Sequence, residues 1–499
     1  MNSKSLLSYS VFFLLLPFLI FCVGYLRWYF AICLILFALW SAYSVVRLDE
    51  KSDSFNISFG QFITLALISL AVSFFLGIGG YWTQSSDWMA KNPLLNDLVT
   101  YSWPLKMDFS EASQDVKSIC GQSEVAFVYY LFYYLPAGLL GKIFGSINVA
   151  RISLLLWSAW GLLLLFVWVL RYFSQLDKRG FRQTIIALLF LLCWGGMDII
   201  GHLLRCVFLW IQGVRPVYAT WRIEEWCRPY FFQYASNWTS LWWSFNQCIP
   251  IWIITIIIFS KRDLRSVGFF YGIALLYSPW CVLGLAPIVV FFVIYSVYKQ
   301  GWAIVCKSVS CANLLFPLSI LLVVGTLYMS NNTPLSEKGF FWHFMNADEF
   351  FYKYFLFIVI EIGFYVWMLR EKLKKDILLL ASIVTLLLLP FYKMTAWNDL
   401  LTRGSMPALF LLSLVWTRWC LDNWHTKKSF IVISVLAGSL GSLQILMTSV
   451  IDTFQAGKPV TTLADESFVT PSVGVAKMAE SQFYAHEYED TFFWKYLAK

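Results

Sequence analysis

Runs of mainly apolar residues, each close to the length needed to cross a lipid bilayer, recur along this 499-residue chain. A membrane-spanning helix needs about 20 such residues. Hydrophobic residues make up 59% of the sequence and charged residues 13%, which is too apolar for a soluble protein of this size. We therefore predict an all-α polytopic membrane protein with roughly 12 or 13 transmembrane helices. The expected spans lie at about 6–25, 28–46, 59–80, 150–171, 183–203, 246–260, 266–280, 282–298, 309–329, 353–370, 376–393, 404–420 and 429–450.

Basic residues set the expected topology. They cluster in short loops near 171–182, 261–265, 370–375 and 418–428, as the positive-inside rule requires. These four loops share one face only if the tyrosine-rich segment 126–145 does not cross the membrane, so we expect an interfacial or re-entrant helix there. The net charge of +8 is explained by these loops and does not indicate a nucleic-acid partner.

This topology gives one transmembrane domain over 1–452, with no soluble catalytic module. An acidic outer loop over 81–149 and a second outer loop over 204–245 lie on the face opposite the basic loops. The residues 453–499 form a short tail on that same outer face.

The first outer loop is the longest polar interruption of the chain. A simple connection between two helices needs only a short turn, whereas this loop carries amides, tryptophans and several carboxylates. Its length and charge suggest chemistry or recognition at the membrane surface. The carboxylates are Asp87, Asp97, Asp108, Glu111 and Asp115.

Ionisable residues near a span usually mark function or a structural pair. Asp198, His202 and Arg205 follow one another at helical spacing and share a helix face. They either form the polar wall of an outward-facing cavity or a pair of Asp198 with Arg205 that holds helices together. Glu361 lies near mid-span and is interpreted as structural.

The second outer loop places Glu224, Glu225 and Arg228 among tryptophans. Carbohydrates suit such a surface, because their hydroxyls need polar acceptors while their apolar faces stack on aromatic rings. An interfacial aromatic belt would explain the rings but not the paired glutamates.

A third polar cluster, with Asn398, Asp399 and Arg403, stands at the start of a late span. Arg403 follows Asp399 by four residues, so a local ion pair is one interpretation. The other is that the Arg403 guanidinium binds a phosphate, for which its planar fork is well shaped.

Well-known catalytic signatures do not occur in the chain. The sequence has no GxxxxGK[ST], GxGxxG, HExxH or GxSxG element and only four histidines. It therefore gives no support for nucleotide hydrolysis, dinucleotide chemistry, zinc proteolysis or serine hydrolysis.

Taken together, several of these segments resemble bacterial multi-span proteins related to the GT-C glycosyltransferase superfamily. In chain order they are SDWMAKNPLLNDLVTYSWPL, YYLFYYLPAGLLGKIFG, GGMDIIG, FQYASNWTSLWWSFNQ, YSPWCVLGLAP, WNDLLTRGSMPAL and DTFFWKYLAK. The resemblance implies a GT-C-like fold, in which a first outer loop carries an acidic catalytic residue and juxtamembrane helices. One difference is that two additional spans precede the span leading into that loop.

The resemblance also implies a function. The expected activity is transfer of a sugar from a polyprenyl-phosphate-linked donor to a cell-envelope glycan or lipid acceptor, such as O-antigen. It would take place in a bacterial inner membrane, with the active site facing the periplasm. The expected partners are this donor, the glycan acceptor and membrane lipids.

Such a transfer needs a base for the acceptor hydroxyl and cations for the departing phosphate. We expect Asp87 to be the base, because it lies closest to the membrane in the acidic loop; Asp97 and Asp198 are the alternatives. A single carboxylate acting on the acceptor would mean inversion at the sugar carbon. The expected phosphate ligands are Lys91, Arg205 and Arg403. The other expected substrate-binding residues are Asn92, Glu224, Glu225, Arg228, Asn246, Gln247, Asn398 and Asp399.

Three alternatives stay open from the sequence. Asp87 and Asp97 could together hold a divalent metal, Mg²⁺ or Mn²⁺, through their oxygens. A transporter or flippase would place its polar groups along a path across the membrane. A polysaccharide polymerase would present arginine-rich outer loops, whereas these loops are mixed in sign.

Overall fold

The chain folds as an all-α polytopic membrane protein, as expected. The computed structural model describes residues 3–48, 55–121, 124–174, 180–214, 222–331, 337–455, 466–479 and 483–499. In these ranges, nine helices are long and apolar enough to cross a membrane, and four shorter apolar helices accompany them. Each of the thirteen falls on one of the expected segments.

The long helices are α1 (Ser3–Tyr25), α2 (Trp28–Arg47), α7 (Ile147–Ser174), α10 (Asn237–Lys261), α12 (Pro279–Gln300), Cys311–Met329, Ala347–Leu373, Asp399–Asp422 and α21 (Trp424–Gln455). Three of them are built from parts: α14 (Phe316–Ile320) with α15 (Thr326–Met329), α16 (Ala347–Ile358) with α17 (Phe364–Leu373), and α19 (Asp399–Gly404) with α20 (Met406–Asp422). The shorter helices are α3 (Phe59–Phe75), α8 (Phe181–Leu192), α11 (Leu264–Tyr277) and Ile377–Phe391, which begins with α18 (Ile377–Leu388).

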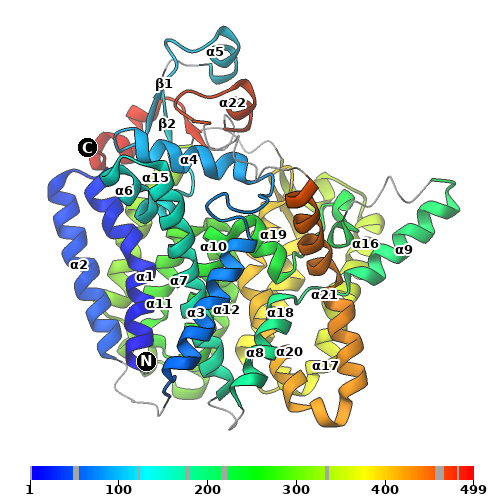
Figure 1. Cartoon of the computed structure of the whole chain (residues 1–499). Helices are drawn as coiled ribbons and strands as arrows, with labels where there is room; N and C mark the ends of the chain where they lie inside the picture. The colour runs from blue at the N-terminus through cyan, green and yellow to red at the C-terminus, as the bar shows by residue number, and fades with distance from the viewer. Residues whose placement is uncertain are drawn as a thin grey trace.

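A polar cap covers one end of the bundle, and the N-terminus lies at the other end (Figure 1). The helices of the cap are α4 (Trp88–Thr100), α5 (Gln114–Cys120), α6 (Leu135–Phe144) and α22 (Val473–Ala479). Its antiparallel sheet has the order β1 (Lys106–Asp108), β2 (Glu124–Phe127), β5 (Tyr484–Ala485). In this sheet Lys106 faces Ala126, which in turn faces Ala485, so the C-terminal tail packs on the first loop. A smaller hairpin pairs β3 (Lys338–Phe340) with β4 (Tyr392–Met394).

The basic loops gather at the end of the bundle that carries the N-terminus. Arg171 and the residues 260–266 line one cavity there with the first turns of α1 and the last of α2. The third and fourth basic segments join them, because Arg262 pairs with Asp376 and Lys372 pairs with Asp422. Lys178 and Arg179 lie outside the described residues. At ten residues, α6 is too short to cross a bilayer, in agreement with the expectation for 126–145.

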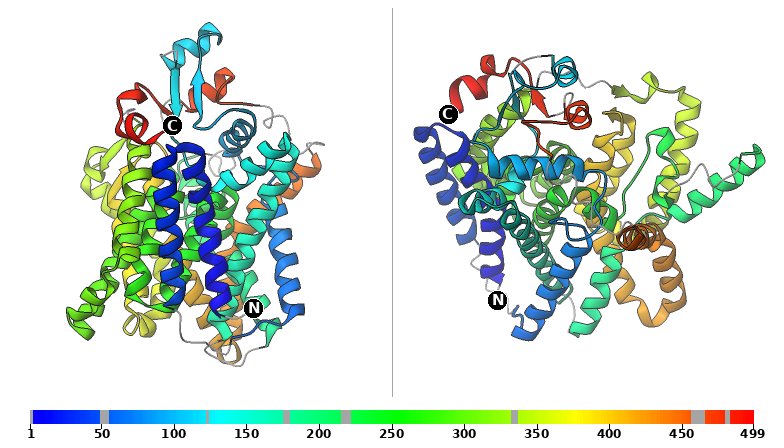
Figure 2. Two further views of the ribbon diagram at one scale, coloured as in Figure 1. Left: turned by 90° about the vertical axis from the view of Figure 1, so that its left-hand side faces the viewer. Right: turned by 45° about the horizontal axis from the view of Figure 1, so that its top comes forward.

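The expected span over 183–203 is wrong in one respect. Helix α8 ends at Leu192, and a separate helix, α9 (Asp198–Ile211), begins after a break. Figure 2 shows α9 projecting sideways from the bundle. The break contains Gly195 and Gly196, which pack closely against Gly438 and Glu361. A side chain at either glycine would collide with these neighbours, and hydropathy alone does not reveal this constraint.

Helix α10 forms the centre of the bundle. Of the 18-residue apolar stretch of α10, 94% is buried inside the bundle, compared with 22% of the corresponding stretch of the peripheral α2. Its lower half is mainly apolar and includes Ile251, Trp252 and Ile256, all buried. Near its cap end the helix is broken at Ser244, where φ is −138° and ψ is 40°. Ser244, at this break, lines a polar cavity at the cap end of the bundle.

Candidate functional site

A polar cavity of about 400 Å³ lies at the cap end of the bundle. Three segments that are far apart in the sequence form its walls: the start of α4, the residues 222–244, and the start of α19 with the loop before it. Its volume is in the usual range for small-molecule sites. Its lining residues are Ser86, Asp87, Arg222, Glu225, Arg228, Gln233, Ala235, Ser240, Trp243, Ser244, Trp397, Asp399, Thr402, Arg403 and Met406.

Asp87 stands at the N-terminal end of α4 and lines the cavity. Its carboxylate does not cap the helix. The two other carboxylates of the lining, Glu225 and Asp399, are each paired with arginine. Asp87 is therefore the one carboxylate among the described lining residues that no arginine holds. It is partly exposed to the cavity and available to a ligand.

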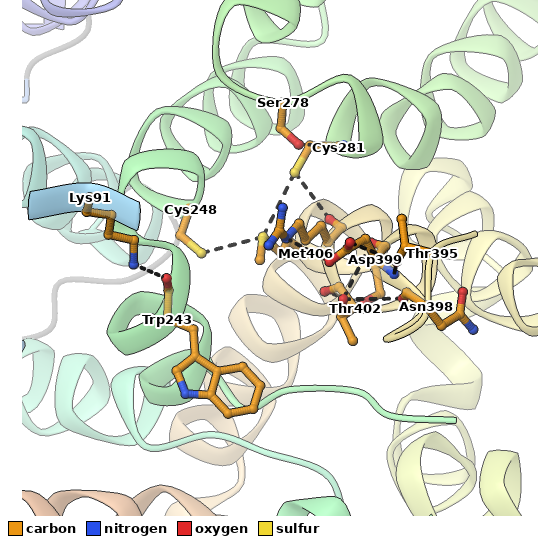
Figure 3. Close-up of polar contacts among 12 residues, drawn as sticks. Lys91, Trp243, Cys248, Ser278, Cys281, Thr395, Asn398, Asp399, Thr402 and Met406 are labelled. Atoms are coloured by element: carbon orange, nitrogen blue, oxygen red, sulfur yellow. Dashed lines mark hydrogen bonds and ion pairs between the residues drawn. The ribbon is translucent and has the colours of Figure 1, made fainter. Parts of the chain in front are cut away.

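Lys91, one turn after Asp87, contacts Trp243 of the cavity wall but does not itself line the cavity. It is buried, and its ammonium donates to the carbonyl oxygen of Trp243 (Figure 3). The ammonium also lies 5.2 Å from the Trp88 ring centroid. Burial lowers the pKa of Lys91 to about 8, and the Asp87 carboxylate opposes this effect. Lys91 is thus a cation whose charge changes close to neutral pH.

The second wall is a short network of charges and aromatic rings. Glu225 accepts from Arg228 at 2.8 Å and from Arg222 at 3.3 Å. The Arg222 guanidinium lies 5.2 Å from the ring centroid of Trp243, and that of Arg228 lies 4.4 Å from Trp397. Both arginines are therefore held between a carboxylate and a ring, with part of each surface left for a ligand.

The third wall is built around Asp399. Its Oδ1 lies 3.3 Å from Nε of Arg403, and its Oδ2 accepts from the Thr395 hydroxyl at 2.8 Å. The expected local ion pair is therefore present, and it fixes Arg403 at the cavity. Asn398 has a left-handed φ of 53° and donates to the carbonyl of Phe231 at 2.9 Å. It positions the loop rather than lining the cavity.

Two cysteines outside the lining contact Arg403 and Met406 of this cavity, whereas the predicted residues Asn246 and Gln247 do not line it. Cys281 donates to the carbonyl of Arg403 at 3.2 Å, and Cys248 lies 3.5 Å from the sulfur of Met406 (Figure 3). Asn246 and Gln247, just after the break in α10, are buried, and their side-chain oxygens have no hydrogen-bond partner among the described residues. Such unpartnered acceptors are unusual in a folded protein.

Several site residues were missed from the sequence. Trp243, Trp397 and Gln233 line the cavity, and Arg403 lies beside Tyr129 and Tyr130. Burial raises the pKa of Tyr129, and the Arg403 charge opposes the rise. In the sequence these aromatic residues look like the rest of a chain with 25 tryptophans and 26 tyrosines, so only their contacts single them out.

Asp97 and Asn92 lie on α4 but have other partners. Asp97 is fully buried and accepts from the Ser467 hydroxyl at 2.5 Å and from the Phe468 amide at 2.7 Å. Asn92 donates to Gln84 at 2.8 Å. Neither residue lines the cavity, and Asp97 fastens the C-terminal tail to α4.

The Asp97 contact gives a testable pH dependence of stability. Burial raises the pKa of Asp97 to about 7, although its hydrogen bonds lower it. In the unfolded chain the pKa returns to about 4, so between about pH 4 and 7 only the folded state holds this proton. Stability should fall as pH rises through that window, by up to about 4 kcal/mol. Thermal unfolding of Asp97→Asn should show less of this fall, because an amide does not titrate.

The control for this experiment is Asp108→Asn, an exposed carboxylate of β1 in the same cap. It should keep the pH dependence of the wild-type protein. Equal slopes for Asp97→Asn and wild type between pH values of about 4 and 7 would contradict the assignment.

Asp198 and Glu224 belong to a second, fully buried group with Glu361. Burial and the neighbouring Glu361 and Glu224 carboxyls raise the pKa of Asp198. Glu224 accepts from the Ser236 amide at 3.2 Å, and Glu361 accepts from the Trp226 indole at 2.8 Å. Burial beside two other carboxyls therefore favours the protonated form of Asp198. The three residues join α9, the second loop and the π-helical turn Val359–Gly363.

Arg205 does not extend this group into the cavity. Its guanidinium donates to the carbonyl oxygens of Glu225 and Trp226, at 3.3 Å and 3.1 Å. Arg205 therefore holds the backbone of the second loop and does not line the cavity. Asp198 and Glu224 also lie outside the lining of the cavity.

The arrangement of Asp87 and Asp97 does not fit the Mg²⁺ or Mn²⁺ site that the sequence suggested for this pair. Both oxygens of Asp97 are used by Ser467 and Phe468, whereas Asp87 faces the cavity. Among the described residues, no three His, Cys, Asp or Glu side chains are grouped so that they could hold an ion.

Fold and site together define a multi-pass, all-helical membrane protein with one mixed-charge, aromatic-walled cavity at its capped end. No protein-family model, curated protein or solved structure matches the chain. Its function is therefore argued from the cavity itself.

Proposed function

We propose that this protein is a membrane glycosyltransferase with a GT-C-like fold, which takes its sugar from a polyprenyl-phosphate donor. The observation that carries the proposal is the Asp87 carboxylate, not held by an arginine, in a cavity that also presents three arginines and two tryptophans. A sugar phosphate needs this combination: a base, cations for the phosphate and rings for the apolar sugar face.

The proposed reaction is a single displacement. Asp87 takes the proton of the acceptor hydroxyl, whose oxygen forms a bond to the anomeric carbon of the sugar. The bond from that carbon to the phosphate oxygen breaks, and the lipid phosphate leaves with the electron pair. Since one carboxylate acts on the acceptor and no covalent intermediate is formed, the anomeric configuration inverts.

The negative charge of the leaving phosphate grows during this step, so cations already in place lower the barrier. Arg403 is fixed by Asp399 and is the best placed for this role. Arg222 and Arg228 present guanidinium groups from the opposite wall, and Lys91 adds a charge close to both Asp87 and Arg403. Trp243 and Trp397 offer rings for the sugar.

The setting that suits this proposal is a bacterial inner membrane with the cavity on the periplasmic side, and the acceptor is a cell-envelope glycan or lipid. The test compares the surface-glycan composition of cells with and without the gene, followed by transfer from a polyprenyl-phosphate sugar to the glycan by the purified protein in liposomes. Loss of one sugar residue in the deletion, restored by the gene, is the expected result. An unchanged glycan would contradict the proposal.

The lowered pKa of Lys91 predicts how the reaction depends on pH. As pH rises through about 8, Lys91 loses its proton, and the phosphate loses a nearby positive charge. The rate of transfer should therefore fall above this pH. In Lys91→Arg the charge persists, because a guanidinium stays protonated to pH values above about 12, and the fall should disappear. Initial rates across the pH range, in wild type and variant, provide the measurement.

A matched control is Lys106→Arg, because Lys106 is an exposed lysine of β1 outside the cavity. Its pH profile should equal that of the wild type. A decline above about pH 8 that survives in Lys91→Arg would assign the titration to another group.

A polysaccharide polymerase is a second candidate, favoured by the meeting of Arg222, Arg228 and Arg403 in one cavity. It would change the chain length of the glycan, not its sugar composition, so the same deletion separates the two. A transporter is less well supported, since the buried apolar half of α10 lies below the cavity, where a polar path would have to run.

A further inference from the structure

A second cavity, of about 790 Å³, lies at the opposite end of the bundle. It is bounded by the start of α1, the end of α2, the end of α7, the connection between α10 and α11, the end of α12, and α13 (Ala303–Ser308). This is the end that carries the N-terminus in Figure 1, away from α4. The cavity takes no part in the proposed transfer.

The lining is strongly basic. Its described residues include one carboxylate, Asp263, and five cationic side chains: Arg171, Lys261, Arg262, Arg265 and Lys307. Asp263 is already engaged, because it accepts from Nη2 of Arg265 at 2.7 Å and caps α11. Arg262 also pairs with Asp376, which stands outside the lining. The remaining cations, Arg171, Lys261 and Lys307, still give the cavity an excess of positive charge at this end of the bundle.

The local structure holds these charges in a shaped site. Arg262 has a left-handed φ of 49°, which turns the chain sharply between α10 and α11. Arg171 is only 6% exposed, and its guanidinium lies 4.9 Å from the ring centroid of Trp168. A guanidinium buried this deeply at a cavity wall is well suited to a phosphate oxygen.

The remaining lining adds hydroxyl and apolar groups. The Ser260 hydroxyl oxygen is buried with no hydrogen-bond partner among the described residues, and Ser266 and Ser296 are buried beside the cavity. Leu7 and Val45 supply apolar surface from α1 and α2. The lining of this cavity thus combines cationic, hydroxyl and apolar side chains.

We propose that this basic cavity binds a phosphate group. The phosphate comes either from the headgroup of an anionic phospholipid, whose chains would continue along the apolar wall, or from a free phosphate in solution. Basic pockets between transmembrane helices are a common means of binding anionic lipid headgroups. This site is independent of the proposed transferase activity.

The test uses the full-length protein in detergent, with two probes. Native mass spectrometry compares retention of phosphatidylglycerol and of zwitterionic phosphatidylethanolamine, and thermal unfolding is followed with and without inorganic phosphate. One variant is the double substitution Lys261→Gln and Lys307→Gln. The other is the single substitution Lys307→Gln, which changes an exposed side chain. Lys299→Gln, on α12 but outside the lining, is the matched control.

Phosphatidylglycerol should be retained in preference to phosphatidylethanolamine, and its affinity should fall about fivefold for each lysine removed. The control should bind like the wild type. A second outcome would also support the site: inorganic phosphate stabilises the wild type but not the variants, and the two lipids are retained equally. The ligand would then be a phosphate from solution. Equal retention of both lipids, with no phosphate effect that separates wild type from the double variant, would overturn the proposal.

Discussion

Asp87→Asn is expected to lower the rate of sugar transfer by a factor of about 10² to 10⁴, the usual contribution of a general base. An amide is nearly the same size as the carboxylate but cannot take the proton of the acceptor hydroxyl. The folded protein should tolerate the change, because Asp87 does not cap α4 and is not held by an arginine. Thermal unfolding should therefore be close to that of the wild type.

This variant separates chemistry from folding when rate and stability are measured on the same preparation. Glu111→Gln, an exposed carboxyl in the same loop, is the control and should transfer sugar at the wild-type rate. Near wild-type transfer by Asp87→Asn, in a protein whose deletion removes a sugar, would keep the transferase and refute Asp87 as its base.

Gly284→Ala should have the largest effect on structure near the site. Gly284 lies on α12, and a Cβ atom there would overlap the carbonyl group of Gly404. Backbone cannot rotate away as a side chain can, so α12 and α19 would have to separate. Overpacking of this kind typically costs about 1 to 3 kcal/mol, more than alanine gains in a helix.

The same separation should impair catalysis. Gly404 directly follows Arg403, whose own carbonyl accepts from Cys281 on α12. Moving α19 would displace the guanidinium from the cavity, so both the melting temperature and the transfer rate should fall. Gly60→Ala on α3, where a Cβ meets no atom within 4 Å, is the control. Its stability should stay the same or rise by up to about 1 kcal/mol. Equal stability of the two variants would contradict this packing argument.

The membrane-spanning helices could be predicted well because they depend on local composition. An apolar run of sufficient length has few alternatives in lipid. Each of the thirteen expected segments coincides with an apolar helix of the described residues, and nine of these helices are long enough to cross a membrane. The error at 183–203 has a different origin. The break after α8 contains Gly195 and Gly196, which lie too close to Gly438 and Glu361 to carry a side chain, and these neighbours are distant in sequence. Hydropathy does not contain that information.

The site shows the same division. Each of the three predicted polar clusters contributes to one cavity, which Asp87, Glu225, Arg228, Asp399 and Arg403 line. Asp97 could not be distinguished from Asp87 in the sequence, since both carboxylates lie in the same acidic loop. Its partners, Ser467 and Phe468, lie about 370 residues further along the chain.

The attachment of Asp97 to the tail has a consequence for the order of assembly. During synthesis, every membrane-spanning helix leaves the ribosome before Ser467 and before β5, which completes the sheet with β2. Chains grow at roughly 5 to 20 residues per second, and segments fold as they emerge. The bundle can therefore enter the bilayer while α4 still lacks its anchor. Helix α4 gains its Asp97 anchor only when the last segments dock, so the cap is completed after the bundle has been inserted.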